Sequence, residues 1–456
     1  MPPVSSSPIA TARMAPGPPD YYVLRHLRST ARDPIGSCLH FWKQYGDITR
    51  LHWWGPFHAY ICVHPQMVEQ VLQANWSNYS KGFFYKRLAT FAGNGLLTSE
   101  GDLWLRQRRL AQPAFHRARI ARLADLMAQT VADMCDEWDR NSTDKPFDLA
   151  GEMMRLTLQI AARALFGTEM HGAAAHRFHE LMNIGMAHVE HRTNPLTLPE
   201  NVPTPRNKRF LWAKAELEKW ILEIVHKRRC GSEKGDDLLQ MLVDARDEET
   251  GEGMSDAQLF DEVITLLIAG HETSADALAW GFSLLARHPE KREILESESA
   301  KLNGHLPTMD NLDSLPYARQ VFEESLRLYP PFWAIGREAL GDDEIGGFEV
   351  KARSTVLLPP FLTHRHPEFW PDPERFEPDR FLPAESAKRP KFAYFPFGGG
   401  PRLCIGQSFG LMEGQIALSV ITARFRLELA PFEKLVMDPS PTLRPHGGLW
   451  MTRTRM

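Results

Sequence analysis

The sequence predicts a mainly α protein with a small β region, built as a single large domain around a long central helix. Apolar residues recur every three or four positions over long stretches of the 456 residues, which is the spacing of helices. Strand-like runs are short and occur near residues 48–63 and 348–358. No internal repeat and no clear linker divides the chain. We therefore expect one domain whose small β region contains segments from both ends of the chain.

The predicted central helix runs from Ser255 to about His288. Ser255 and Gln258 form a capping box at its start. At a rise of about 1.5 Å per residue, a helix of ~30 residues spans roughly 45 Å, enough to cross a domain of this size. The same apolar spacing predicts shorter helices over 123–138, 210–225 and 414–425.

Turn residues and prolines mark the segments between these elements. Gly55-Pro56 separates two strand-like runs at 48–54 and 58–63. Four prolines exclude a helix over 194–206, and five prolines indicate a long ordered meander over 363–383. Residues 1–30 are predicted to be a disordered, proline-rich lead-in, which leaves 31–456 as the domain.

Composition excludes several classes of protein. Hydrophobic residues make up 43% and charged residues 24%, which is ordinary for a globular chain. A net charge of −4 argues against a nucleic-acid binder. The five cysteines are few, odd in number and without a CxxC pair, which argues against a secreted disulfide scaffold. No apolar run reaches the ~18 residues of a membrane span, and no signal core precedes the domain, so we expect a cytoplasmic protein without a transmembrane anchor.

A glycine-rich segment leads to Cys404. Gly398 to Gly400 allow a sharp turn, and a helical run follows from Gln407. A cysteine at a helix N-terminus is favoured as a thiolate. Arg402 can offer charge to a nearby acidic group, and Phe397 can shield the sulfur from water. The pattern indicates a thiolate metal ligand in a tight loop, and a buried structural cysteine is the alternative that a single cysteine leaves open.

Inside the central helix, small residues and one hydroxyl form a stripe. Leu266, Ala269, Gly270, Thr273 and Ala277 share one face by their spacing. Glycine and a threonine bonded to its own backbone can open a helix locally and admit a water or a small ligand, and the neighbouring acid Glu272 is a source of protons. The alternative is a contact between two closely crossing helices, with the hydroxyl bonded to the backbone.

Two charged or aromatic pairs lie at helical spacing. Glu324 and Arg327 precede Pro330-Pro331 among apolar neighbours that suggest burial, and Arg375 is a possible third partner. Trp104 and Arg108 share a helix face within an arginine-rich segment. Solvated surface pairs, which contribute little to stability, are the alternative for both.

Together and in this order, these elements resemble the cytochrome P450 superfamily of haem-thiolate monooxygenases, in its soluble, bacterial-type form. The resemblance extends over nearly all of residues 31–456. The matching motifs are WxxxR at Trp104 and Arg108, (A/G)Gx(D/E)T at 269–273, ExxR at Glu324 and Arg327, and FxxGxRxCxG at 397–406.

The resemblance implies the cytochrome P450 fold and haem b, an iron protoporphyrin IX with Cys404 as its thiolate ligand, with O2 as co-substrate. Thr273 and Glu272 would be catalytic and relay protons. The implied haem-binding residues besides Cys404 are Trp104, Arg108, Arg337, Arg402, Phe397, Ala269, Leu96, Ile405 and Gly406. The implied substrate-binding residues are Phe84, Leu97, Leu266, Phe332, Ile335 and Leu449. Glu324, Arg327 and Arg375 would be structural.

The implied activity is that of an oxidoreductase that hydroxylates or epoxidises a hydrophobic small molecule such as a fatty acid, terpenoid or steroid. Electrons would come from a separate ferredoxin or flavodoxin and its reductase, for which the arginine-rich segment 106–122 is a candidate docking face. The proline-rich segment 194–206 would be a lid over the substrate entry. Two alternatives are a haem-thiolate peroxygenase, isomerase or dehydratase that needs no redox partner, and a non-catalytic haem sensor, which the Glu272-Thr273 pair disfavours.

Overall fold

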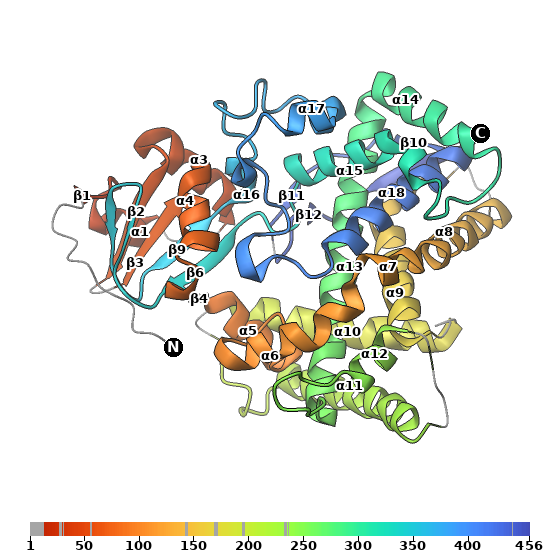
Figure 1. Cartoon of the computed structure of the whole chain (residues 1–456). Coiled ribbons are helices and arrows are strands. Elements are labelled where there is room, and N and C mark those ends of the chain that lie inside the picture. The colour runs from red at the N-terminus through yellow and green to blue at the C-terminus, as the bar shows by residue number, and fades with distance from the viewer. Residues whose placement is uncertain are drawn as a thin grey trace. The chain divides into compact units, whose positions relative to one another are not determined.

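The computed structural model describes residues 13–26, 30, 32–54, 57–141, 145–167, 172–193, 197–231, 235, 237–439 and 441–456 (Figure 1). The chain divides into two compact units, each assembled from separate stretches of sequence. Unit 1 comprises Met1–Phe83, Phe332–Arg375 and Pro383–Cys404. Unit 2 comprises Phe84–Pro331, Phe376–Leu382 and Ile405–Met456.

Part of the predicted lead-in has regular structure. Strand β1 (Arg13–Met14) pairs in parallel with β8 (Phe348–Val350), and helix α1 (Asp20–Arg25) follows. Residues 1–12 and 27–29 lie outside the described residues, so the disordered lead-in stays a prediction there.

Unit 1 contains a five-stranded sheet in the described residues, with the strand order β2-β3-β9-β6-β4. Strands β2 and β3 pair in antiparallel fashion on either side of residues 55–56, which confirms the predicted hairpin. The predicted stretch 348–358 forms two strands instead of one, because the chain turns at Arg353, whose φ is 66°. Unit 1 strands are β2 (Ile48–Trp54), β3 (Phe57–Cys62), β4 (Tyr79–Lys81), β6 (Ile335–Ala339), β7 (Asp343–Ile345) and β9 (Thr355–Leu358), besides β1 and β8.

Apolar side chains of this sheet form the core of unit 1. Cys62, Val356 and Leu358 are fully buried there, together with Val68 and Val71 from the helical turns after β3. The sheet therefore gives a rigid support to the loops that follow it. The helical segments of unit 1 besides α1 are α3 (Pro34–Tyr45), α4 (Pro65–Glu69), η1 (Gln70–Ala74), η2 (Trp76–Asn78), α16 (Pro360–Thr363), α17 (Pro383–Ser386), η7 (Lys391–Ala393) and η8 (Gly400–Arg402).

Unit 2 is built around the predicted long helix, α13 (Asp256–Arg287). The Ser255 hydroxyl accepts from the Gln258 N–H, as the capping box predicts. The helix ends before Pro289, because the residue that precedes a proline is pushed out of the helical region. Its 32 residues correspond to about 48 Å.

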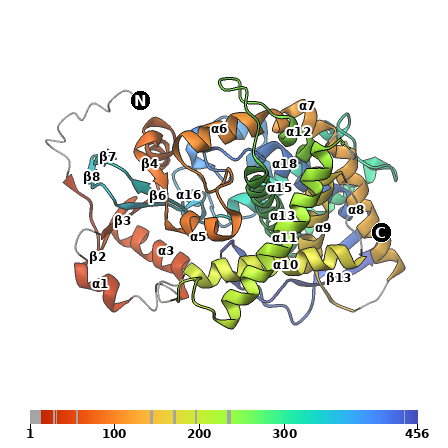
Figure 2. The ribbon, with the colours of Figure 1, turned by 90° about the horizontal axis from the view of Figure 1, so that it is seen from below.

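Other helices of unit 2 pack around α13, in particular α9, α11, α15 and α18. Figure 2 shows α10 and α11, which lie side by side and belong to this unit. The helices predicted over 123–138, 210–225 and 414–425 are all present. The bounds are α5 (Phe83–Ala92), α6 (Gly101–Ala111), η3 (Gln112–Phe115), α7 (Arg117–Ala121), α8 (Leu123–Arg140), α9 (Leu149–Phe166), α10 (Gly172–Thr193), α11 (Pro205–Arg229), α12 (Leu238–Asp244), α14 (Pro289–Ser299), η4 (Ala300–Leu302), η5 (Leu312–Ser314), α15 (Pro316–Leu328), η6 (Pro378–Phe381) and α18 (Gln407–Arg424).

Two small sheets complete unit 2. One has the order β10-β13-β5 and the other pairs β11 with β12. Their strands are β5 (Phe147–Asp148), β10 (Phe425–Leu429), β11 (Met437–Asp438), β12 (Arg444–Pro445) and β13 (Trp450–Arg455). More of the described residues lie in helices than in strands, which confirms the predicted mainly α fold class. Among the described residues, no helix is both long and apolar enough to cross a membrane.

Candidate active site

The glycine-rich loop of unit 1 presents Cys404 at the surface. Gly398 and Gly400 have φ values of 72° and 65°, in the left-handed region that favours glycine. A Cβ atom on Gly400 would lie 1.8 Å from the Leu72 carbonyl oxygen, so no side chain fits there. The Cys404 N–H donates to the Phe397 carbonyl at 3.0 Å and closes the loop.

The exposure of Cys404 distinguishes it from the structural cysteines. Cys38 and Cys135 are buried, and burial raises the pKa of each thiol to about 12. Cys404 is exposed. The alternative of a buried structural cysteine therefore does not hold for Cys404.

Buried positive charges lie on the strands of the same unit. Arg337 on β6 stands directly opposite Lys81 on β4 in the antiparallel register, and both are buried. The Arg402 guanidinium donates to the Tyr79 carbonyl, two residues before Lys81, at 2.9 Å. Like charges placed opposite each other repel, so this cluster suits a group that carries carboxylates. Sequence reasoning named Arg337 and Arg402 but missed Lys81, whose place follows from strand pairing.

In unit 2, the middle of α13 has one open face. Ala269 is exposed and Leu266, Gly270 and Thr273 are partly exposed, whereas Ala277 and most of the surrounding helix are buried. A Cβ atom on Gly270 would meet only Ala161, at an ordinary 3.7 Å. A close helix crossing is therefore not the reason for this glycine.

The hydroxyl and the acid of this stretch have different surroundings. Thr273 Oγ1 donates to the Ala269 carbonyl at 2.8 Å, which is the backbone bond that the alternative reading expected. Glu272 is buried, and its Oε1 accepts from the Thr442 hydroxyl at 3.0 Å. Burial raises the pKa of Glu272 above its usual value, and the bond from Thr442 lowers it in part. A buried acid with a raised pKa is a candidate for holding and passing a proton.

Helix α6 carries Trp104 and Arg108 in unit 2. Trp104 is buried and Arg108 is partly exposed. Nearby in sequence, the Leu96 N–H donates to Glu262 of α13 at 3.0 Å, so α13 holds this segment. The remaining predicted haem residues, Phe397, Ile405 and Gly406, flank Cys404 along the chain and are all partly exposed.

Glu324 and Arg327 on α15 form a buried ion pair. Arg327 Nε and Nη2 donate to the two Glu324 carboxylate oxygens at 2.6 and 2.8 Å, and both side chains are 0% exposed. The Glu377 N–H also donates to Glu324 Oε1 at 2.8 Å. The pair therefore anchors the loop after residue 376 to α15 and is not a solvated surface pair.

The structure corrects the third member of this cluster. Arg380, with its Nε 3.6 Å from Glu324 Oε1, stands where Arg375 was expected. Arg375 is exposed and belongs to unit 1. The two arginines occur in nearly identical surroundings, Pro-Glu-Arg-Phe and Pro-Asp-Arg-Phe, and only the packing of η6 on α15 distinguishes them.

The predicted substrate-binding residues differ in accessibility. Phe84, Leu97 and Leu266 of unit 2 and Phe332 of unit 1 are partly exposed, and Ile335 of unit 1 is buried. Leu449 of unit 2 has no exposed surface. Its N–H donates to Asp148, which ties it into the core of unit 2.

Side chains that flank the proline-rich segment 194–206 donate hydrogen bonds to its backbone. Arg192 donates to the Leu198 carbonyl at 2.6 Å, and Asn207 donates to the Val202 carbonyl at 2.8 Å. Residues 197–204 contain no helix, and α11 begins at Pro205, where proline fits the first helical turn. Residues 194–196 lie outside the described residues.

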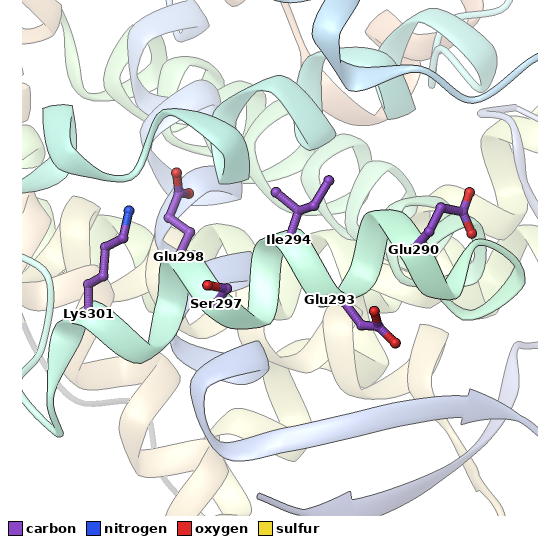
Figure 3. Close-up of a pocket in the computed structure, with 6 residues that line it drawn as sticks. All are labelled: Glu290, Glu293, Ile294, Ser297, Glu298 and Lys301. Carbon is purple, nitrogen blue, oxygen red and sulfur yellow. The ribbon is translucent and has the colours of Figure 1, made fainter.

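A shallow groove of about 430 Å³ lies along α14 (Figure 3). It is lined by Glu290, Glu293, Ile294, Ser297, Glu298 and Lys301. Glu298 accepts from the N–H groups of Tyr317 and Ala318 at 2.9 Å each and so caps the start of α15. The groove contains no residue of the motifs described above.

The family model described as cytochrome P450 matches residues 15–451. The chain belongs to the cytochrome P450 family. Cyclooctatin synthase of Streptomyces melanosporofaciens is 38% identical over 92% of this chain and 91% of that protein. Pentalenene oxygenase of Streptomyces avermitilis is 32% identical over 90% of each. The crystal structure of the cytochrome P450DA heme domain matches with a TM-score of 0.88 and 26% identity over 98% of both chains.

This P450 is an oxidoreductase of the monooxygenase class. The family implies a haem held by a cysteine thiolate and the use of O2. The exposed Cys404 in its glycine loop and the cations Lys81, Arg337 and Arg402 fit the iron and the carboxylates of such a group.

Proposed function

We propose that this P450 hydroxylates or epoxidises a terpenoid, with O2 and electrons from a separate redox protein. The observation that carries the proposal is the open stripe of α13, where Ala269 and Thr273 adjoin the buried acid Glu272. To oxidise an apolar molecule, the protein must provide an apolar face beside a hydroxyl and a proton source. This stretch of α13 has all three.

Bound through Cys404, the haem supplies the activation of O2. The side chains of this protein bind the haem carboxylates, supply a proton and keep the substrate face apolar. Lys81, Arg337 and Arg402 hold carboxylates, and Trp104 and Arg108 are proposed to add donors from α6. Burial raises the pKa of Glu272 and so favours its protonated form, which makes it the proposed proton donor toward the Thr273 hydroxyl. Leu266 and Ala269 keep the open face apolar and so exclude water.

The terpenoid class is favoured among the three predicted classes by the relatives. One, 36% identical over 92% of this chain, is named cyclooctat-9-en-7-ol 5-monooxygenase, and another is named pentalenene oxygenase. These names denote an unsaturated alcohol and an unsaturated hydrocarbon. The mostly apolar predicted lining, Phe84, Leu97, Leu266, Phe332 and Ile335, suits such molecules.

The proposed redox partner is an acidic ferredoxin or a flavodoxin that docks on the arginine-rich segment 106–122. Two arginines of this segment already bind other residues of unit 2, so they are less available to a partner protein. Arg109 is bound to Asp247 at 2.9 Å and to Glu249, and Arg106 donates to the Gly253 carbonyl at 2.9 Å. Arg119 is exposed on α7. Charge reversal at Arg119 is therefore a better test of docking than at Arg109, whose loss would break contacts within unit 2.

The proposal is tested by ligand binding followed by turnover. We expect cyclic terpenes to convert the haem spin state on titration, and to be oxidised when ferredoxin, its reductase and NAD(P)H are supplied. Fatty acids and steroids are the matched comparison. Oxidation with peroxide but not with the redox proteins would favour a peroxygenase instead, and binding of small polar molecules alone would overturn the apolar site.

Replacement of Thr273 by Ala is expected to uncouple oxygen consumption from product formation. The variant keeps the apolar stripe but lacks the hydroxyl, so proton delivery from Glu272 loses its positioned relay. We expect the yield of product per NAD(P)H to fall about 100-fold, the low end of what a positioned proton donor contributes, while O2 uptake continues. Thr265→Ala, in a buried threonine two turns earlier on α13, is the control. Full yield in Thr273→Ala would contradict the assigned role.

A further inference from the structure

The segment 93–97, between α5 and α6, lies directly against the first half of α13. A Cβ atom on Gly95 would clash with Thr265 Oγ1 and would lie 2.5 Å from the Asp261 carbonyl oxygen. A Cβ atom on Gly93, whose φ is 63°, would clash with the Asp261 carboxylate. No side chain fits at either position. The two glycines therefore allow the backbone of this segment to lie flat on the helix.

Two neighbouring acids of α13 accept hydrogen bonds from the backbone of this segment. Asp261 Oδ2 accepts from the Asn94 N–H at 2.8 Å, and Glu262 Oε2 accepts from the Leu96 N–H at 3.0 Å. Glu262 is only 1% exposed, so water does not compete for this bond. Hydrogen bonds to a carboxylate are stronger than those between neutral groups. The two acids therefore clasp alternate residues of the segment 93–97.

Two further helices hold the same stretch of chain. Lys214 of α11 donates to the Thr90 carbonyl, near the end of α5, at 2.9 Å. Gln107 of α6 donates to the Asn94 carbonyl at 2.6 Å. All of these residues belong to unit 2. In each bond a side chain of a helix binds the main chain, so these bonds fix the position of the backbone itself.

The clasped segment covers one end of the open stripe on α13. The stripe starts at Leu266, and the same helix face continues toward the start of the helix at Glu262, four residues earlier. There the Leu96 N–H binds Glu262, and both residues are buried. Leu97, the predicted substrate-binding residue of this segment, is partly exposed and is held in place with it. The segment is therefore an end wall for an apolar molecule that lies along the stripe.

We propose that Asp261 and Glu262 are positioning residues for the substrate. By clasping the segment 93–97 they fix the end wall of the apolar face, and the wall decides which carbon of a bound terpenoid lies beside Thr273. Both acids act through the segment, because their bonds go to its N–H groups. The inference rests on the proposed function, since it places an apolar substrate on the open stripe.

The first test is amide hydrogen exchange of the segment in the haem-loaded protein without substrate. We expect the Leu96 amide to exchange about 10–100-fold faster in Glu262→Ala, because a hydrogen bond to a charged group is lost. Asp261→Ala is expected to have the same effect at Asn94. Glu262→Gln keeps an accepting oxygen and is expected to restore most of the protection. Asp256→Asn removes an acid of α13 that pairs with an arginine of α11 instead, and is expected to leave the exchange unchanged.

A change on the side of the segment tests the same contact and keeps both acids. Gly95→Ala adds a methyl group that clashes with Thr265 and the Asp261 carbonyl, so the segment has to move away from α13. We expect its amides to exchange faster, and this variant gives an answer even if an acid-to-alanine variant does not fold. Gly281→Ala makes the same change later on α13, at an ordinary 3.6 Å from Ser325 Oγ, and is the matched control.

The second test is the ratio of products formed from a cyclic terpene, which a merely structural role would not move. We expect Asp261→Ala and Gly95→Ala to oxidise a broader set of carbons, with the Soret band of the reduced, carbon-monoxide-treated protein unchanged. Glu262→Gln is expected to keep the wild-type ratio.

The outcomes separate the clasp from the function on which its role depends. Unchanged exchange in Glu262→Ala and Gly95→Ala would show that the clasp does not exist. Faster exchange with an unchanged product ratio would overturn the positioning role. Failure of any terpene to bind the wild type, with the exchange results as expected, would instead refute the proposed function and leave the clasp in place.

Discussion

Replacement of Cys404 by Ser is expected to abolish the thiolate-type Soret band of the reduced, carbon-monoxide-treated protein and nearly all monooxygenase turnover. The thiolate donates electron density to the iron, and this donation favours cleavage of the O–O bond. A serine oxygen does not replace it. Changes in groups that merely orient a metal ligand cost about 10–100-fold in activity or affinity, so loss of the ligand itself is expected to exceed this range.

Cys230 provides the matched control for this experiment. It is the other exposed cysteine and lies at the end of α11, where its Sγ is 3.6 Å from His226 Nε2. Cys230→Ser makes the same chemical change away from the glycine loop and is expected to keep both the Soret band and turnover. An unchanged band in Cys404→Ser, or loss of the band in Cys230→Ser as well, would refute the assignment of the ligand.

Glu324→Gln is expected to destabilise the protein by about 3–5 kcal/mol, because it leaves the fully buried Arg327 with an uncompensated charge. The amide also cannot accept from Arg327 and the Glu377 N–H as the carboxylate does, and it lacks the charge that pairs with Arg380. The loop that follows residue 376 is then expected to detach from α15. Urea unfolding of the haem-loaded protein measures the change as a lower midpoint.

The neighbouring residue supplies the control. Glu323 pairs with Arg319 at 3.6 Å, and the Arg319 side chain is half exposed, so solvent screens the interaction. Glu323→Gln is expected to change the free energy of unfolding by about 0.5 kcal/mol or less. Equal effects of the two substitutions would show that the Glu324 cluster is not the anchor described here.

Much of the fold follows from local pattern. The central helix was predictable because its cap, its apolar spacing and the proline after it act within a few residues of the chain. The same holds for the hairpin around residues 55–56. Arg353 interrupts the stretch 348–358, and this was not predictable, since an arginine in the left-handed region leaves no mark in the residue pattern.

The candidate site was predictable where its residues are adjacent in sequence. The Cys404 loop and the Ala269–Thr273 stretch are short motifs, and the glycine at 400 is required by backbone geometry. Lys81 was missed because it meets Arg337 only through strand pairing across more than two hundred residues. Within the segment 106–122, Arg109 is similarly paired with Asp247, which lies far along the chain, and the residue pattern gives no sign of this pair.

By itself, the sequence determined the fold class, the family resemblance and the cysteine at the centre of the chemistry, because each depends on interactions within one element or one loop. The tertiary structure decided which of two equivalent arginines joins Glu324, that Leu449 is closed off from solvent, and that the buried Glu272 accepts a hydrogen bond from Thr442. These outcomes depend on desolvation and on charges brought together from distant segments, which spacing along the chain does not encode.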